Sequence, residues 1–155
     1  MLRSFFKLNY RNTPHIMGSQ MDHHPTPLGN WLETLFNKLF YQPDDGLCKK
    51  AMEEEISPQL KICINGQHMP RESYDRVIAE TRRTYNIRVQ SSRELLASSD
   101  ATDKGVGSVA HIQTFTLEDK KTGAQRKQTS LTISVIASGD GGKQLVELSE
   151  IMLEN

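Results

Sequence analysis

The sequence has few of the features that fix a protein's class at once. Only two cysteines, Cys48 and Cys63, occur in 155 residues, so they could form at most one bridge, and we expect both thiols to be free and buried. Lysine plus arginine equals aspartate plus glutamate, at 19 each, so no net charge draws the chain toward nucleic acid or an anionic membrane. We therefore expect neither nucleic acid nor a membrane as a partner.

Long apolar runs and catalytic signatures are also missing. No run approaches the ~18 apolar residues of a membrane span, and no Asn-x-Ser/Thr acceptor hints at secretion. HExxH and CxxC motifs are absent, and His23 and His24 have no third ligand at useful spacing, so we expect no metal. The glycine-rich segment 139–142 joins two predicted strands and opens no helix, which argues against a phosphate cradle. We expect no cofactor.

The N-terminal segment, residues 1–24, is predicted to be a leader outside the fold, and residues 25–155 to be a single domain. Residues 1–21 are basic, amphipathic and free of acidic residues, which is the pattern of a mitochondrial transit peptide. A disordered leader, or a start codon upstream of Met17 or Met21, explains the same composition. We expect a cytoplasmic location, with a mitochondrial one through residues 1–21 as the alternative.

The last third of the chain predicts three successive antiparallel strands. They cover Val109–Leu117, Lys127–Ala137 and Gln144–Leu153, and each run is rich in Val, Ile, Thr and Phe. The breaks at 119–123 and 138–143 contain the Gly and Asp residues that tight reversals need.

The chain before these strands predicts helices that cover one face of the sheet. Apolar residues recur at helical spacing in Leu28–Tyr41, Leu47–Ile56 and Pro70–Tyr85, and we expect Leu47 on the inner side of the second helix. A short hairpin around Asn65-Gly66 separates the second and third helices, and a further strand starts at Asn86. Helices grouped before an antiparallel sheet predict an α+β domain.

This order of elements resembles the nuclear transport factor 2-like superfamily and, within it, the SnoaL-like group. Three local matches carry the resemblance: Ile64-Asn65-Gly66-Gln67 before the third helix, the strand segment 128–133, and Gly142–Glu150, which is similar to a family ending of the type GKIVEHWD. Together they span about residues 28–153. The resemblance implies a cone-shaped, curved antiparallel sheet with three helices in its concave face and a pocket inside.

The last strand departs from the pattern of many SnoaL-like enzymes. Where they have His-Trp-Asp, this chain has Leu148-Ser149-Glu150. The acid is kept as Glu150, one carbon longer, while the histidine and tryptophan are missing. The acid/base role that the resemblance implies would therefore depend on Glu150 without the histidine and the tryptophan.

Strand parity gives one independent argument for Glu150 as a catalytic residue. Val146, Leu148, Glu150 and Met152 share a face. A carboxyl among apolar neighbours is desolvated and its pKa rises, which is how a general acid or base is tuned toward neutral pH. If the strand end is exposed instead, Glu150 is simply solvated.

His111 is the second catalytic candidate, since it shares a strand face with Gln113 and Phe115. A lone histidine on an apolar face is more commonly structural. We expect five residues to bind a ligand: Trp31, Tyr74, Gln113, Phe115 and Leu148. Core packing is the alternative explanation for Trp31 and Tyr74.

Two functional hypotheses follow. The first is a cofactor-independent isomerase, cyclase or dehydratase that acts on a hydrophobic metabolite by proton transfer, with Glu150 as acid or base and His111 as its partner. The second is a non-catalytic module of the same fold that binds a ligand or another protein. A homodimer through the open sheet face suits either hypothesis, because exposed strands need a cover.

Overall fold

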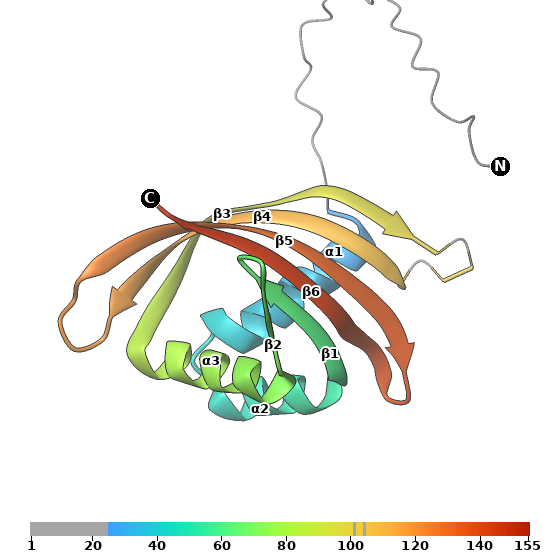
Figure 1. The fold of residues 1–155 in the computed structure, drawn as a ribbon, viewed down its shortest axis with the longest axis horizontal. Helices are drawn as coiled ribbons and strands as arrows, with labels where there is room; N and C mark the ends of the chain where they lie inside the picture. The colour runs from blue at the N-terminus through green and yellow to red at the C-terminus, as the bar shows by residue number, and fades with distance from the viewer. Residues whose placement is uncertain (1–24, 101, 104) are drawn as a thin grey trace, which may run out of the picture.

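The computed structural model describes residues 25–100, 102–103 and 105–155. The predicted leader and its targeting alternative, residues 1–24, lie outside the described residues. The described part contains helices followed by long strands, in the order α1 (Pro27–Phe36), η1 (Asn37–Tyr41), α2 (Asp45–Glu54), β1 (Ile56–Ile64), β2 (Gln67–Met69), α3 (Arg71–Thr84), β3 (Tyr85–Ser99), β4 (Gly107–Asp119), β5 (Gln125–Gly139) and β6 (Gly142–Glu154) (Figure 1).

Side-chain caps set the starts of α1 and α2. The Thr26 hydroxyl accepts a hydrogen bond from the amide of Gly29 at 3.1 Å, and Pro27 occupies the first helical position. The Asp44 carboxylate accepts from the amides of Gly46 and Leu47. Both helices therefore begin one or two residues before the first apolar residue that periodicity identifies.

The first predicted helix ends at Tyr41, as expected, but its last turn is wider than an α-helix. The Gln42 amide donates to the Asn37 carbonyl at 3.2 Å, five residues back, which is the bond of the π-helix η1. The bulky pair Phe40 and Tyr41 lies in this widened turn. Apolar periodicity alone does not reveal such a widening.

The sheet has six strands in the order β2-β1-β6-β5-β4-β3. All neighbours pair antiparallel except β1 and β6, which run parallel. The expected antiparallel sheet is therefore found except for that one pair. The chain leaves β1 through the short hairpin and α3, and only the last strand, β6, returns to pair with β1. Such a crossover permits a parallel pairing.

The second predicted helix ends earlier than expected. Its last residue is Glu54, and Ile56, fully buried, already starts β1. Ser57-Pro58 therefore lies inside a strand, where the pairing with β6 shifts register between Ile56 and Lys61. Leu47, expected on the inner side of this helix together with Cys48 and Ala51, is 39% exposed. Cys48 and Ala51 are buried as expected, and Leu47 lies about 100° around the helix from Cys48.

The predicted hairpin turn is confirmed. Asn65 and Gly66 have φ values of 48° and 77°, the left-handed pair of a two-residue turn that favours Asn-Gly. The turn returns the chain as β2, whose residues Gln67–Met69 pair with Ile62–Ile64.

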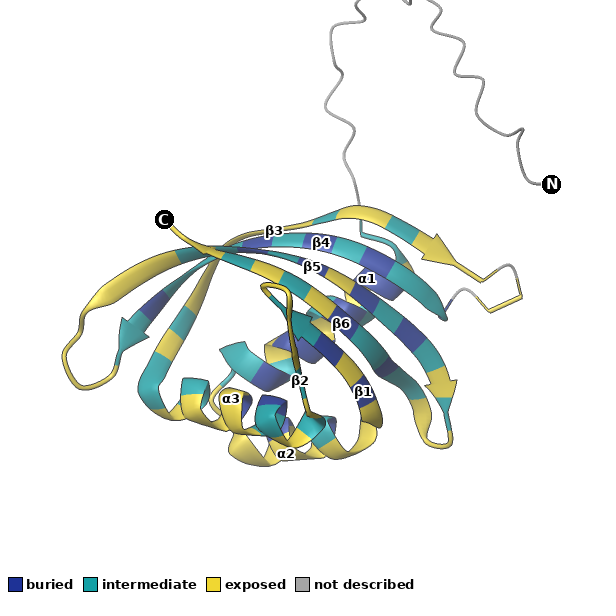
Figure 2. Ribbon diagram, viewed as in Figure 1, coloured by how far each residue is buried: buried dark blue, intermediate teal, exposed yellow. Residues whose placement is uncertain are grey.

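The helices lie in the concave side of the curved sheet, which arches over them in Figure 1. Buried residues concentrate on the helix faces and on the inner face of the sheet (Figure 2). The predicted α+β class, with three helices in the concave face of a curved sheet, is confirmed. Among the described residues, no helix is long and apolar enough to cross a membrane.

Gly107 is the position where the backbone most clearly requires glycine. Its φ is +148°, and a Cβ atom would overlap the carbonyl oxygen of Ser98 on the paired strand β3. We expect Gly107→Ala to lower the free energy of unfolding by about 1–3 kcal/mol, measured by urea denaturation. Gly141→Ala is the control, because no atom beyond its chain neighbours lies within 4 Å of the place that the added methyl group would occupy; equal losses in the two variants would contradict the prediction.

Candidate functional site

A cavity of about 210 Å³ lies between the helices and the concave face of the sheet. We call it the inner cavity. Its wall is mostly apolar and aromatic, and a few polar groups from β4, β5 and β6 point into it. Its lining residues include Phe40, Tyr41, Tyr74, Tyr85, Ile87, Gln113, Phe115, Arg126, Ser130, Leu148 and Glu150.

Glu150 contributes the carboxyl group of the inner cavity. It lies on β6 opposite Thr132 of β5, and Leu148 and Met152 on the same face also line the cavity. Burial raises the pKa of Glu150, and the neighbouring Ser130 hydroxyl acts in the opposite direction. Among the described residues, no basic side chain forms an ion pair with this carboxylate.

Two phenols, Tyr41 and Tyr74, accompany Glu150 in the cavity. Burial raises the pKa of both hydroxyls, and the negative charge of Glu150 is the next largest cause for each. Both therefore keep their protons at neutral pH. The Tyr41 hydroxyl donates to Gln113 Oε1 at 2.6 Å, whereas that of Tyr74, a 3% exposed residue of the cavity wall, makes no hydrogen bond to a described residue.

Phe115 and Leu148 supply apolar wall from β4 and β6. The exposed Arg126 lines the same cavity, and its guanidinium donates to the Tyr85 hydroxyl at 2.8 Å and lies 5.2 Å from the centre of that ring. These contacts fix Tyr85 and Arg126 to one another at the end of the cavity where β5 begins.

His111 does not line the inner cavity. It is 1% exposed, and its Nε2 lies 3.0 Å from Glu33 Oε1 of α1 and 2.9 Å from Ser92 Oγ of β3. A Ser–His–Glu relay needs hydroxyl and carboxylate on opposite ring nitrogens; here both meet Nε2, and Nδ1 has no partner among the described residues. The contacts of His111 attach α1 to the sheet.

Five of the seven residues predicted for the site lie together in the inner cavity: Tyr74, Gln113, Phe115, Leu148 and Glu150. His111 and Trp31 lie outside it. Trp31 is partly buried and packs against the hydrophobic core, and α1 covers the stretch of β4 that contains His111. The alternation of side chains along β4 and β6 identifies the inner face of the sheet correctly. The position of α1 then decides which part of that face lines the cavity.

Tyr41 is one of several cavity residues that the sequence analysis missed, together with Phe40, Tyr85, Ile87, Arg126 and Ser130. It ends the apolar stripe of the first helix, and that position is the only sequence signal for it. The π-turn brings it, together with Phe40, into the cavity wall. Gln113 then connects Tyr41 with Ser92, to whose hydroxyl its Nε2 donates at 3.4 Å.

Among the described residues, no cluster of three or more His, Cys, Asp or Glu side chains has the geometry to hold a metal ion. Cys48 is buried and Cys63 partly buried, and both are free. The polar groups that the inner cavity offers to a ligand are therefore a carboxyl, phenols, an amide and hydroxyls, with Arg126 at one end.

No model of a known protein family matches the chain, and no curated protein matches it. Solved structures do. A nuclear transport factor 2-like protein of unknown function from Exiguobacterium sp. 255-15 superposes with a TM-score of 0.56 at 12% identity, over 80% of this chain and 97% of that one. This chain is similar to it in fold.

Two further structures have the same architecture. A ketosteroid isomerase-like protein from Erwinia carotovora atroseptica SCRI1043 has a TM-score of 0.57 at 12% identity, covering 79% of this chain and 88% of its own. A protein from Jannaschia sp. CCS1 described as a SnoaL-like polyketide cyclase has a TM-score of 0.53 at 14% identity, covering 84% and 90%. At these identities the likeness concerns the fold.

The contacts of His111 generate a test of its role. We expect His111→Ala to lower the free energy of unfolding by about 2–4 kcal/mol, because a buried ring and its hydrogen bonds to α1 and β3 are lost. The pKa of Glu150, followed by NMR, should stay unchanged. Ser92→Ala, which removes one exposed hydroxyl, should cost less than about 1 kcal/mol. A shifted Glu150 titration with unchanged stability would contradict this assignment.

Proposed function

We propose that this chain, which has the nuclear transport factor 2-like fold, binds a small hydrophobic molecule in the inner cavity and that Glu150 transfers a proton there. The observation that supports this best is a buried carboxyl with a raised pKa in a mostly apolar cavity. Perturbed carboxyls in concave, apolar pockets are typical of acid/base sites.

The chemistry that suits these groups is proton transfer next to a carbonyl group. Ionised Glu150 would take a proton from the carbon beside the carbonyl, and the carbonyl oxygen would become the enolate oxygen. The Tyr74 hydroxyl, which makes no hydrogen bond to a described residue, would donate to that oxygen as its charge develops. Return of the proton to another carbon gives an isomerase, and loss of a leaving group gives a lyase.

The comparisons agree with this proposal at the level of fold. Proteins described as ketosteroid isomerase-like and as a SnoaL-like polyketide cyclase share the architecture, as does one described as having unknown function. Because one fold supports many functions, the argument for proton transfer rests on Glu150 and the phenols of this chain.

A non-catalytic homodimeric module is the second candidate, and the convex face of the sheet supports it. Four large apolar side chains on the described strands are more than half exposed: Leu96 at 71%, Leu153 at 62%, Ile151 at 57% and Ile133 at 51%. Ile133 lies opposite Ser149, and Ile151 opposite Leu131, so three of these residues share the outer face of β5 and β6. We propose that two copies of the chain pack these faces together, whether or not the cavity is catalytic.

Titration of Glu150 tests the catalytic proposal. We expect its pKa, measured by NMR, to lie above the ~4.3 of a free glutamate and to move when hydrophobic ligands bind. Since the folded state keeps this proton to a higher pH than the unfolded chain, stability falls as the pH rises through the folded pKa, at up to ~1.4 kcal/mol per pH unit. Glu150→Gln should remove that fall and abolish proton transfer.

Glu147→Gln is the matched control for Glu150→Gln. Glu147 lies on the same strand but on the opposite face, where it pairs with Lys61 at 2.8 Å, and its side chain is 47% exposed. Its replacement should leave ligand binding and the fall of stability that Glu150 causes unchanged. An ordinary, ligand-insensitive pKa for Glu150 would remove the candidate catalyst and favour the non-catalytic module.

The dimer proposal is tested by introducing charge into the convex face. We expect the full chain to sediment as a dimer, and the double variant Ile133→Lys/Ile151→Lys to sediment as a monomer with near-native far-UV circular dichroism, because buried like charges oppose association. Ala124→Lys, in the exposed β4–β5 turn, should remain dimeric. A monomeric wild-type chain at high concentration would contradict the proposal.

A further inference from the structure

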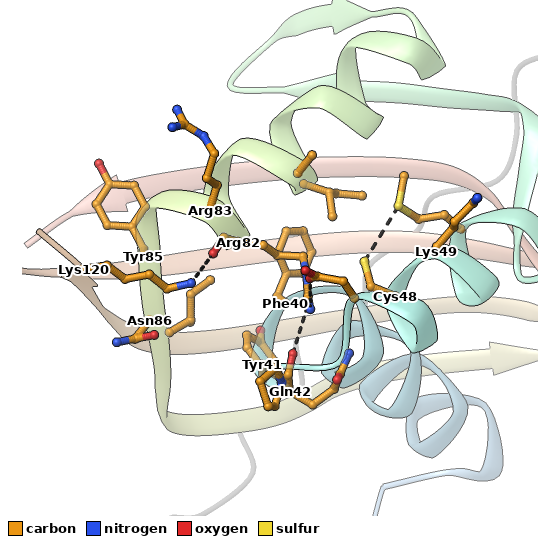
Figure 3. A pocket seen from close by; sticks show the side chains of 16 residues that line it. Phe40, Tyr41, Gln42, Cys48, Lys49, Arg82, Arg83, Tyr85, Asn86 and Lys120 are labelled. Atoms are coloured by element: carbon orange, nitrogen blue, oxygen red, sulfur yellow. Dashed lines mark hydrogen bonds and ion pairs between the residues drawn. The ribbon is translucent and has the colours of Figure 1, made fainter.

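A second hollow of about 580 Å³ lies beside the inner cavity (Figure 3). We call it the outer cleft. Its walls come from η1 and α2 on one side and from the C-terminal end of α3, the start of β3 and the β4–β5 turn on the other. Cys48 and Met52 of α2 and Ile78 of α3 contribute apolar surface to it.

The outer cleft and the inner cavity share part of their walls. Phe40, Tyr41, Tyr85 and Ile87 line both. The inner cavity alone, at about 210 Å³, is smaller than the roughly 300–1,000 Å³ of most small-molecule sites. The two hollows are therefore neighbours, and a molecule too long for the inner cavity would extend toward the outer cleft past these shared side chains.

The outer cleft is basic. Lys49, Arg82, Arg83 and Lys120 line it, and Asp45 is the only acidic residue among its lining residues. These cations come from α2, from α3 and from the β4–β5 turn, which are far apart in the sequence (Figure 3). The inner cavity differs, since its charged lining residues are one acid, Glu150, and one base, Arg126, which is held on Tyr85.

Arg82 already makes four hydrogen bonds within the protein from its five N–H donors. Its side chain is 9% exposed and donates to Asp45 at 2.7 Å and to the carbonyls of Leu39 and Gln42. These bonds hold the two sides of the cleft together and neutralise Asp45. The charge available to a ligand is that of the other three cations.

The three other cations also have partners, but at the surface. Lys49 lies 3.9 Å from Glu53, and Arg83 donates to both carboxylate oxygens of Glu80 at 2.6–3.0 Å. All four of these side chains are more than half exposed, so water and ligands compete for both pairs. Lys120 donates its ammonium to the backbone carbonyl of Arg82 and forms no ion pair among the described residues.

Stabilisation of the end of α3 is the simpler explanation for part of this charge. Cations near a helix C-terminus interact favourably with its free carbonyls, and both the ammonium and the amide of Lys120 donate there, the amide to the Thr84 carbonyl at 2.9 Å. This accounts for Lys120 and for Arg82 and Arg83, the basic residues of the last turn of α3. It accounts neither for Lys49, which belongs to α2, nor for the hollow among these side chains.

We infer that the outer cleft binds the anionic head group, a carboxylate or a phosphate, of the molecule whose apolar part occupies the inner cavity. This inference rests on the proposed ligand-binding function of that cavity. Glu150 excludes a second negative charge from the interior, while the cations of the cleft attract it. The ligand is thereby oriented with its apolar part toward Glu150, and neutral hydrophobic molecules are bound less well.

Calorimetric titration of the full chain with three probes of equal length tests the inference. The probes are decanoate, decyl phosphate and 1-decanol, each at low ionic strength. We expect one or both anions to bind about tenfold more tightly than the alcohol, which is the effect of two or three partly exposed charge contacts. The tighter of the two anions identifies the head group, and added salt should weaken anion binding alone.

The double variant Lys49→Gln/Arg83→Gln should lose most of this preference, with anion affinity reduced about fivefold to tenfold and 1-decanol affinity unchanged. Lys50→Gln/Arg76→Gln is the matched control. It removes the same charges from the same two helices, at exposed residues that do not line the cleft, and it should bind all three probes as the wild-type chain does.

The outcomes separate this inference from the function proposed for the inner cavity. Equal affinity for alcohol and anions, or equal losses in the two double variants, overturns the outer cleft as an anion site and leaves the inner cavity as a ligand site. Failure of every probe to bind overturns both. An anion preference lost only in Lys49→Gln/Arg83→Gln supports the inference.

Discussion

The structure depends on the contact between one leucine stripe and the concave face of the sheet. Leu28, Leu32, Leu35 and Leu39, all at most 1% exposed, come from a single rod formed by α1 and η1. Burying four such side chains stabilises the fold by roughly 6–12 kcal/mol before conformational entropy is subtracted. The curvature of the sheet makes this contact possible, because a flat sheet would leave the rod on its surface.

The same contact divides the concave face into two parts. The buried polar residues of the described chain are His111, Gln113, Ser130, Thr132 and Ser134, which all lie on β4 and β5 and face inward. Where α1 covers this face, a polar residue contacts the helix, as His111 does through Glu33. At the η1 end of the rod, Gln113, Ser130 and Thr132 line the inner cavity, and Gln113 accepts a hydrogen bond from Tyr41. One end of the face is thus structural and the other is a site.

The sequence predicts the elements well and the site in part, and the difference has a physical cause. Alternation along β6 places Glu150 on the inner face, and Asn65-Gly66 identifies its turn, because both signals are local. His111 and Gln113 look equivalent by parity, being two residues apart. Only tertiary packing, with Glu33 of α1 reaching His111 and Tyr41 reaching Gln113, separates them. Likewise, the parallel β1–β6 pair and the π-turn depend on contacts that no local pattern contains.

Charge is segregated in the same way as packing. Glu150 lies between the sheet and the phenols, where burial destabilises its ionised form. Lys49 and Arg83 of the outer cleft lie at the surface, where water solvates their charge. Arg126, also exposed, is fixed on Tyr85, and no ion pair joins it to Glu150. A cation beside Glu150 would stabilise the carboxylate and return its pKa to the ordinary range. The distance between Glu150 and the cations therefore preserves the raised pKa of Glu150, on which proton transfer would depend. The positive charge of the outer cleft would still favour ligands with an anionic head group.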